Sequence, residues 1–345
     1  MEKAKFILDK KIVKEQIKSL LDLGLSVSYS YKTNHEVGNV LQELNLGNFF
    51  SIHSINEIKM IKDKSKVIYF IQAQDFEELK GIINQGILNF VVDNEIDFGR
   101  ILDVAKFLET KINLSIRMKL QENRIGSGRY FVYGLPSKKV NELIIREKEN
   151  KFINYFGIHV HRKSQNTSEW EIISELEDSI LDEVFDRLDF INLGGGLPVK
   201  YKSYSSNILE YIFKKIKETV NWLKNKDIQV FIEPGRYIAA PSIKLETRII
   251  QIQEKNIILN TTLYNCALDT LLTGTKMIVE NELKDKEEGE YYLIKGNSPT
   301  RDDIFRYNVK LRNPKVGDKI IFINAGAYNY TTDFFGYVKL ETEYI

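Results

Sequence analysis

Eight short apolar segments, each followed by a longer amphipathic one, constrain the fold of this chain more than any other feature of its sequence. The short segments are rich in β-branched and aromatic residues, and polar or glycine-containing stretches bound them, as is typical of buried parallel strands. They cover residues 26–32, 48–53, 66–72, 89–94, 112–119, 156–163, 190–196 and 229–235. This alternation predicts an α/β fold, either a (β/α)8 barrel or a doubly wound open sheet.

The segments between these strands have helical character. In the segment 168–186, apolar residues recur at helical spacing, and we predict further helices over 56–63, 75–85 and 207–226. After about residue 240 the pattern changes to strand-like runs without intervening helices, at 243–253, 256–263, 291–294 and 319–324, with a turn at 314–318. We therefore predict a barrel over 8–240, followed by an all-β domain over 241–345 that also takes up the first few residues of the chain.

The composition excludes several classes of function. Lys plus Arg number 49 and Asp plus Glu 48, and this balance gives no electrostatic reason to expect nucleic acid or an anionic membrane as partner. The single cysteine, Cys266, has no partner for a disulfide within the chain, which favours a reducing compartment. We find no signal-peptide pattern and no run of about 18 uncharged apolar residues, so we expect a cytoplasmic protein.

The first predicted strand ends in a lysine, Lys32. Burying an ammonium group is costly, and a lysine amine that has lost its water shell is a good nucleophile toward carbonyl groups. A lysine that extends from a strand end into solvent is the alternative. In a barrel, the ends of the strands are where the chemistry takes place.

Two histidines, His159 and His161, lie two residues apart in the sixth predicted strand, so both should point to the same face. They could bind a metal together with Glu233. Alternatively, one imidazole could stack on a flat cofactor, beside a hydroxyl of Ser164 that binds a phosphate. A pair of hydrogen-bonded core histidines is the purely structural interpretation.

The seventh and eighth predicted strands end in groups that suit an anionic, aromatic ligand. Three consecutive glycines, 194–196, allow close approach of the backbone to an anion, and this is where barrels commonly bind phosphate. Glu233 could hold a pyridine nitrogen in its protonated state, and Arg236 could bind a phosphate with both guanidinium nitrogens. A surface pair of Glu and Arg beside a turn is the alternative.

Together, and in this order along the chain, these motifs resemble those of the fold-type III pyridoxal-phosphate decarboxylases. That family includes the diaminopimelate, ornithine and carboxynorspermidine decarboxylases and has an alanine-racemase-like barrel. The resemblance covers nearly the whole chain and rests on residues 31–34, 159–165, 194–196, 233–236, 316–318 and 324–328. It implies decarboxylation of an amino acid or a related intermediate, with pyridoxal phosphate as cofactor, by a head-to-tail homodimer whose active sites lie at the interface.

The resemblance also implies roles for individual residues. Lys32 would carry the cofactor as a Schiff base, Glu233 would keep the ring nitrogen protonated, and His161 would stack on the ring. The phosphate would be bound by Ser164, Gly194, Gly195, Gly196, Arg236 and Tyr328.

Several positions depart from the family pattern. Lys163 stands where the family has glycine, and Pro299 and Thr300 stand where the partner subunit normally offers a cysteine and an acidic residue. The second acid of ornithine enzymes would fall near Cys266, and the arginine of diaminopimelate enzymes near Thr273. We therefore predict a substrate other than ornithine or diaminopimelate, such as a siderophore, polyamine or peptide-antibiotic intermediate. The candidate substrate residues are Arg117, Cys266, Thr300, Arg301 and Asp302.

Three other functions remain open from the sequence. An amino-acid racemase or epimerase shares the fold and the cofactor but needs an acid–base residue on each face of the substrate. A pyridoxal-phosphate-binding protein without catalysis is compatible with the missing cysteine. A metal-dependent barrel hydrolase would use the two histidines.

Overall fold

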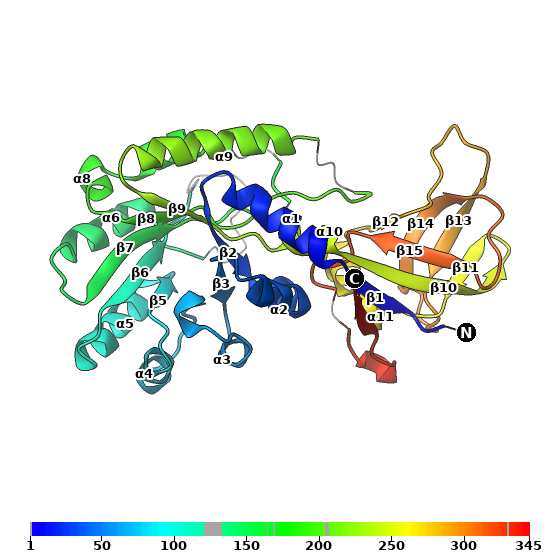
Figure 1. Ribbon diagram of the computed structural model, residues 1–345, viewed down its shortest axis with the longest axis horizontal. Helices are drawn as coiled ribbons and strands as arrows, with labels where there is room; N and C mark the ends of the chain where they lie inside the picture. The colour runs from blue at the N-terminus through cyan, green and yellow to red at the C-terminus, as the bar shows by residue number, and fades with distance from the viewer. Residues whose placement is uncertain (1, 121–132, 164, 168–169, 204–206, 330) are drawn as a thin grey trace.

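The computed structural model describes residues 2–120, 133–163, 165–167, 170–203, 207–329 and 331–345 (Figure 1). Eight parallel strands form a closed barrel, in which β2 pairs with β9 and so completes the ring. This closure confirms the predicted barrel and excludes the open sheet. The strands are β2 (Ser26–Ser30), β3 (Phe49–Ile52), β4 (Val67–Phe70), β5 (Asn89–Val92), β6 (Ile112–Arg117), β7 (Ile153–His159), β8 (Phe190–Asn192) and β9 (Gln229–Ile232).

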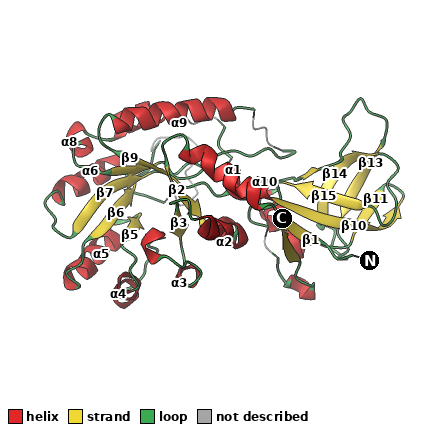
Figure 2. Ribbon diagram, in the orientation of Figure 1, coloured by secondary structure: helices red, strands yellow, loops and turns green. Residues whose placement is uncertain are grey.

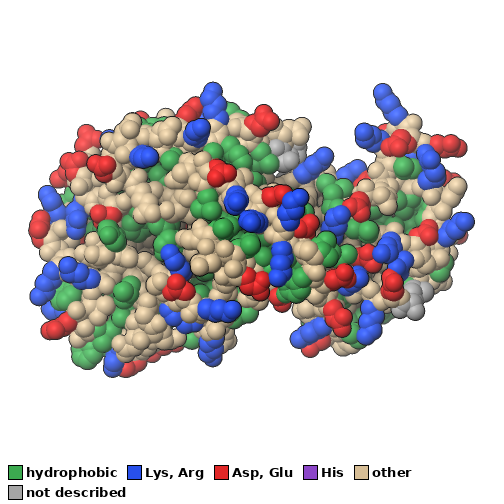
Figure 3. All heavy atoms as spheres, viewed as in Figure 1, with side chains coloured by type: hydrophobic (Ala, Val, Ile, Leu, Met, Phe, Trp, Pro, Cys, Tyr) green, Lys and Arg blue, Asp and Glu red, His purple; other side chains and the backbone are tan. Residues whose placement is uncertain are grey.

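Helices surround the barrel (Figure 2). They are α1 (Lys10–Leu21), α2 (His35–Leu44), α3 (Ile55–Ile58), α4 (Phe76–Asn84), α5 (Glu95–Phe107), α6 (Ser137–Arg146), α7 (Ile172–Ser179), α8 (Asp182–Phe185), α9 (Leu209–Lys224) and α10 (Arg236–Ser242). No helix of the described residues is long and apolar enough to cross a membrane. On the face shown in Figure 3, basic and acidic side chains are interspersed.

The prediction of one continuous helix over 168–186 is wrong, because α7 and α8 are separated by two extended residues, Ile180 and Leu181. The side chain of Asn141 in α6 supports this break. Its amide nitrogen donates to the carbonyl of Ser179 at 2.9 Å, and its oxygen accepts from the N–H of Leu181 at 3.3 Å. A helix here would need those backbone groups for its own hydrogen bonds. A contact from another helix thus overrides the periodic pattern.

The predicted strands run too far at their carboxyl ends. The first strand ends at Ser30, and the chain then forms a short 3₁₀ turn, η1 (Tyr31–Thr33), which contains Lys32. Lys32 is therefore exposed at the barrel mouth rather than buried at a strand end, which corrects the prediction. Similarly, His161 and Glu233 lie in the loops that follow β7 and β9.

A second sheet lies beside the barrel and contains both ends of the chain (Figure 1). β1 (Lys5–Leu8) pairs antiparallel with β10 and parallel with the last strand, so the first residues do join this sheet. The strands that follow β1 are β10 (Ile243–Gln253), β11 (Asn256–Leu259), β12 (Ile278–Val279), β13 (Glu290–Lys295), β14 (Ile304–Leu311), β15 (Lys319–Ile323) and β16 (Glu341–Tyr344). Most of the pairings are antiparallel.

The β-domain is not free of helices, contrary to the prediction. α11 (Leu263–Cys266) and α12 (Leu268–Thr273) follow β11, and they carry buried polar side chains toward the barrel side of the molecule. The predicted boundary at residue 240 falls within α10, a helix that carries Pro241, and this boundary stays a prediction.

Candidate active site

A cavity of about 250 Å³ lies at the carboxyl ends of the barrel strands. It brings together most of the site residues predicted from the sequence, together with His159, considered there as a metal ligand, and His53, for which no role was assigned. The side chains and glycines that line it include Lys32, His53, Arg117, His159, His161, Gly195, Gly196, Glu233, Arg236 and Tyr328. Gly194, next to Gly195 in the chain, is not itself part of the lining, and Ser164 lies outside the described residues.

Glu233 is a buried carboxylate at the base of the cavity. One oxygen accepts from Ser51 Oγ at 2.7 Å and from Asn192 Nδ2 at 3.0 Å, and the other lies 3.0 Å from His159 Nε2. Burial opposes ionisation, but the imidazole of His159 and these hydrogen bonds outweigh it and lower the pKa of Glu233 to about 2. The carboxylate therefore stays charged at neutral pH.

The ring of His161 faces the cavity, nearly parallel to that of His159, with ring centroids 6.2 Å apart and an interplanar angle of 15°. Its Nδ1 accepts from the N–H of Gly195 at 3.3 Å, which fixes the orientation of the ring. Although the ring is open to solvent through the cavity, the surrounding protein lowers the pKa of His161 to about 3. His161 is thus a neutral, flat imidazole at neutral pH.

The glycines allow three loops to meet at the cavity. A Cβ atom at Gly194, where φ is +67°, would lie 2.2 Å from the carbonyl oxygen of Val160. A Cβ at Gly235 would lie 2.1 Å from the hydroxyl of Thr33, so the loop after β9 is packed against η1. Both distances are far below van der Waals contact, and only glycine fits. Glycine at these two positions therefore allows the loops around the cavity to pack closely against one another.

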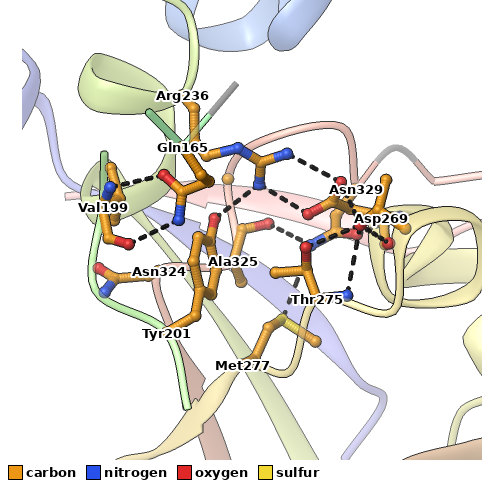
Figure 4. Close-up of polar contacts among 12 residues, drawn as sticks. Gln165, Val199, Tyr201, Arg236, Asp269, Thr275, Met277, Asn324, Ala325 and Asn329 are labelled. Atoms are coloured by element: carbon orange, nitrogen blue, oxygen red, sulfur yellow. Dashed lines mark hydrogen bonds and ion pairs between the residues drawn. The ribbon is translucent and has the colours of Figure 1, made fainter. Parts of the chain in front are cut away.

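The guanidinium of Arg236 is paired with a carboxylate that sequence reasoning missed (Figure 4). Its two terminal nitrogens donate to the carboxylate of Asp269 at 2.7 and 2.9 Å, and one of them also donates to the hydroxyl of Tyr201 at 3.0 Å. These hydrogen bonds raise the pKa of Arg236, although burial opposes this. The rings of Tyr201 and Tyr328 lie 5.4 and 5.2 Å from the guanidinium carbon. Contact of this guanidinium with a phosphate therefore stays a prediction.

Replacing Asp269 by alanine should lower the free energy of unfolding by about 3 kcal/mol, because it leaves a buried guanidinium without its charge partner. Asp269 and Arg236 are only 3% and 7% exposed. The matched control is Asp302→Ala, which breaks the exposed pair with Arg301 and should change stability very little. Urea unfolding of both variants measures the difference, and equal stabilities would contradict the buried-pair interpretation.

Of the predicted substrate residues, only Arg117 lines the cavity. The thiol of Cys266 is buried and donates to the carbonyl of Thr262, and burial raises its pKa to about 12. Thr300 donates to the hydroxyl of Tyr264 at 2.9 Å. The side chains of Arg301 and Asp302 are 94% and 69% exposed. The latter four residues do not reach this chain's own cavity, so their roles stay predictions that require a partner subunit.

A family model decides the class of this chain. Residues 10–240 match the model described as "Pyridoxal-dependent decarboxylase, pyridoxal binding domain". The chain belongs to the pyridoxal-dependent decarboxylases. The resemblance, the fold class and the cofactor predicted from the sequence are thereby confirmed, and the enzyme is a carboxy-lyase.

Individual relatives agree with this class. The diaminopimelate decarboxylase of Archaeoglobus fulgidus is 24% identical over 286 residues, which are 77% of this chain and 68% of the relative. The lysine/ornithine decarboxylase of Selenomonas ruminantium is 21% identical over 317 residues, which are 88% of this chain and 78% of the relative. The crystal structure of the Helicobacter pylori diaminopimelate decarboxylase with L-lysine aligns with a TM-score of 0.83 and 21% identity, covering 100% of this chain and 92% of that one.

The residues of this decarboxylase fit pyridoxal phosphate. Lys32 would supply an amine for its aldehyde, the charged Glu233 would be a partner for its ring nitrogen, and the neutral His161 would offer an aromatic face. Gly195 and Gly196 line the cavity, and their lack of side chains would let a phosphate approach the backbone. His159, His161 and Glu233 also lie close enough to hold a metal ion, with ligand atoms within 4.8 Å of one another. Glu233, however, already has hydrogen-bonding partners in His159, Ser51 and Asn192.

Two residues of the site were missed by sequence reasoning. His53 follows β3, and its position at a barrel strand end was a signal that could have identified it. Asp269 lies on α12, a short helix that the strand-like pattern did not predict, so no comparable signal existed for it.

Proposed function

We propose that this enzyme decarboxylates an amino acid other than ornithine or diaminopimelate, with the cofactor held on Lys32. The observation that carries the proposal is the charge of the cavity. Among the described residues that line it, Glu233 is the one acidic side chain, whereas Lys32, Arg117 and Arg236 are basic. When bound, pyridoxal phosphate accepts the electron pair that remains on the substrate carbon after carbon dioxide leaves.

The chain's own residues would prepare this step. Glu233 stays ionised and would hold a proton on the ring nitrogen, which favours electron withdrawal. His161, kept in orientation by the N–H of Gly195, would support the ring from one face. Gly195, Gly196 and Tyr328 would hold the phosphate. They would thereby fix the position of the cofactor relative to Lys32 and the substrate.

Among the described residues that line the cavity, a distal ammonium group would find no carboxylate other than Glu233. Glu233 is buried and is engaged with His159, Ser51 and Asn192. Cys266 is a neutral buried thiol, and Thr300 is neutral. An unpaired buried charge costs several kcal/mol, so a diamine precursor should bind poorly. Arg117 remains as a cation that faces the cavity and could bind an anionic group of the substrate.

We predict that neither L-ornithine nor meso-diaminopimelate is the best substrate. The test is carbon dioxide release, with kcat/KM measured side by side on ornithine, lysine, arginine, diaminopimelate and carboxylated polyamine precursors. Loss of a buried charge partner should reduce kcat/KM for ornithine by about 10²-fold or more relative to the best substrate. Turnover of ornithine or diaminopimelate with kcat/KM above about 10⁴ M⁻¹s⁻¹, the lower end of the usual range, would contradict it.

We also propose a cytoplasmic homodimer with active sites at the subunit interface. The exposed Arg301 and Asp302, which do not reach this chain's own cavity, support a contribution from one subunit to the site of the other. The buried, protonated Cys266 is compatible with a reducing compartment. Light scattering of the purified protein tests the dimer, and a monomeric mass would contradict it.

A further inference from the structure

His53 contacts the reacting amine and has no role in the function proposed above. It lies directly after β3 and lines the cavity, with its Nε2 at 3.2 Å from Lys32 Nζ. Its ring stacks on Phe70, with ring centroids 4.8 Å apart and an interplanar angle of 8°. Its backbone N–H donates to Glu57 at 3.1 Å. Stacking on Phe70 and the backbone hydrogen bond to Glu57 therefore fix the position of the imidazole, and its Nε2 points toward the lysine amine.

Lys32 must lose a proton before its amine can attack an aldehyde, because an ammonium group has no lone pair. The Nε2 atom of His53 is within hydrogen-bond reach of that proton, which is the geometric requirement for a general base. We propose that His53 is a further catalytic residue that takes a proton from Lys32 Nζ and later returns it. This inference rests on the proposed attachment of the cofactor to Lys32.

One proton moves from Lys32 to His53, and no other group is needed for this transfer. An N–H bond of the Lys32 ammonium breaks and an N–H bond forms on His53 Nε2, so the net charge of the pair is unchanged. On the opposite side of the ring, His53 Nδ1 is buried and has no hydrogen-bond partner among the described residues. The described residues therefore offer no relay through Nδ1, and the proton exchange takes place at Nε2, which faces Lys32.

The surroundings of His53 keep its ring unprotonated at neutral pH, so that Nε2 is free to accept a proton. Burial, and then the positive charge of Lys32, lower the pKa of His53 to about 4, so its ring is neutral above that pH. His159 acts in the same direction, whereas Glu233 and Glu57 favour the charged ring. Once the proton has left Lys32, the lysine charge no longer disfavours the protonated ring, and these two carboxylates stabilise the imidazolium.

A packing role for the ring is the competing explanation, and His35 provides a matched control. His35 contacts the same carboxylate, with its Nε2 at 3.3 Å from Glu57 Oε1, and stacks on Tyr31 with ring centroids 5.0 Å apart. It does not line the cavity. A substitution at His35 therefore perturbs the same neighbourhood without removing a base from Lys32.

The experiment follows attachment of the cofactor to the full-length protein after its bound cofactor has been removed. Pyridoxal phosphate is added to the wild type, His53→Gln, His53→Ala and His35→Gln, and the absorbance change is recorded from pH 4 to pH 10. Borohydride reduction and peptide mass spectrometry then identify the modified lysine. General base catalysis typically contributes 10²–10⁴-fold, so we expect attachment at neutral pH to be about 10²-fold slower in His53→Gln, with the same final occupancy.

Two readouts separate catalysis from packing. In His53→Gln the rate should rise with pH through the alkaline range, whereas the wild-type rate should vary little above about pH 5, where His53 is already neutral. Added imidazole should restore part of the rate in His53→Ala. His35→Gln should attach cofactor at the wild-type rate.

The outcomes also distinguish this inference from the proposed function. If the wild type is modified at Lys32 and His53→Gln shows the same rate and pH profile, the role of His53 is overturned and the proposed function stands. An equal loss of rate in His35→Gln, or a slow His53→Ala that imidazole does not accelerate, would assign His53 a packing role and overturn the inference as well. If the wild type is modified at another lysine, the proposed function itself fails.

Discussion

Replacement of Lys32 by alanine should abolish decarboxylation, with a loss of at least about 10⁴-fold in kcat, or more than 5 kcal/mol of transition-state stabilisation. Lys32 is the one lysine among the described residues that line the cavity, so within that part of the chain no other side-chain amine is in place to hold the cofactor. The wild-type protein should be yellow when purified. Borohydride reduction should attach the cofactor to a peptide that contains Lys32, and the alanine variant should lose both properties.

The control is Lys62→Ala, which removes an exposed lysine outside the cavity and should leave the absorbance and the turnover unchanged. Attachment of the cofactor to a different peptide, or no binding at saturating pyridoxal phosphate, would refute the assignment of Lys32.

Replacement of Glu233 by glutamine should leave cofactor binding largely intact but reduce kcat by about 10³-fold, or about 4 kcal/mol. The amide has nearly the same shape but carries no charge, so it cannot stabilise a protonated ring nitrogen. Because the pKa of Glu233 is depressed to about 2, the carboxylate is charged across the pH range of ordinary assays. A decline of kcat between pH 4 and pH 7 should therefore arise from a different group.

Ser51→Ala is a milder variant that tests the same site. It removes one of the hydrogen bonds to Glu233 but keeps the negative charge. We expect the activation free energy of turnover to rise by about 1 to 2 kcal/mol, which lowers kcat. Titration with pyridoxal phosphate separates binding from turnover in both variants. If Glu233→Gln turns over at the wild-type rate, Glu233 does not act on the ring nitrogen.

Much of the fold and the centre of the site could be predicted from local sequence patterns. All eight barrel strands correspond to predicted segments, because a buried parallel strand must be apolar on both faces. The carboxyl ends of parallel strands meet at one end of a barrel, so residues after different strands converge without any knowledge of long-range contacts. For this reason Lys32, His161 and Glu233 could be placed together before their distances were known.

The environment of each group depended on the tertiary structure. The sequence indicates that Arg236 follows a strand but not that Asp269 pairs with it, because the docking of α12 brings residues 33 positions apart into contact. The burial of Cys266 and the break between α7 and α8 likewise follow from packing against other elements. So does the approach of His53 to Lys32, since it depends on stacking against Phe70. The sequence by itself determined the barrel and which residues reach its mouth, because strand periodicity and strand ends are local properties. Only the tertiary structure decided which charges are paired and which atoms exchange a proton, because these depend on distances between elements that are remote in the chain.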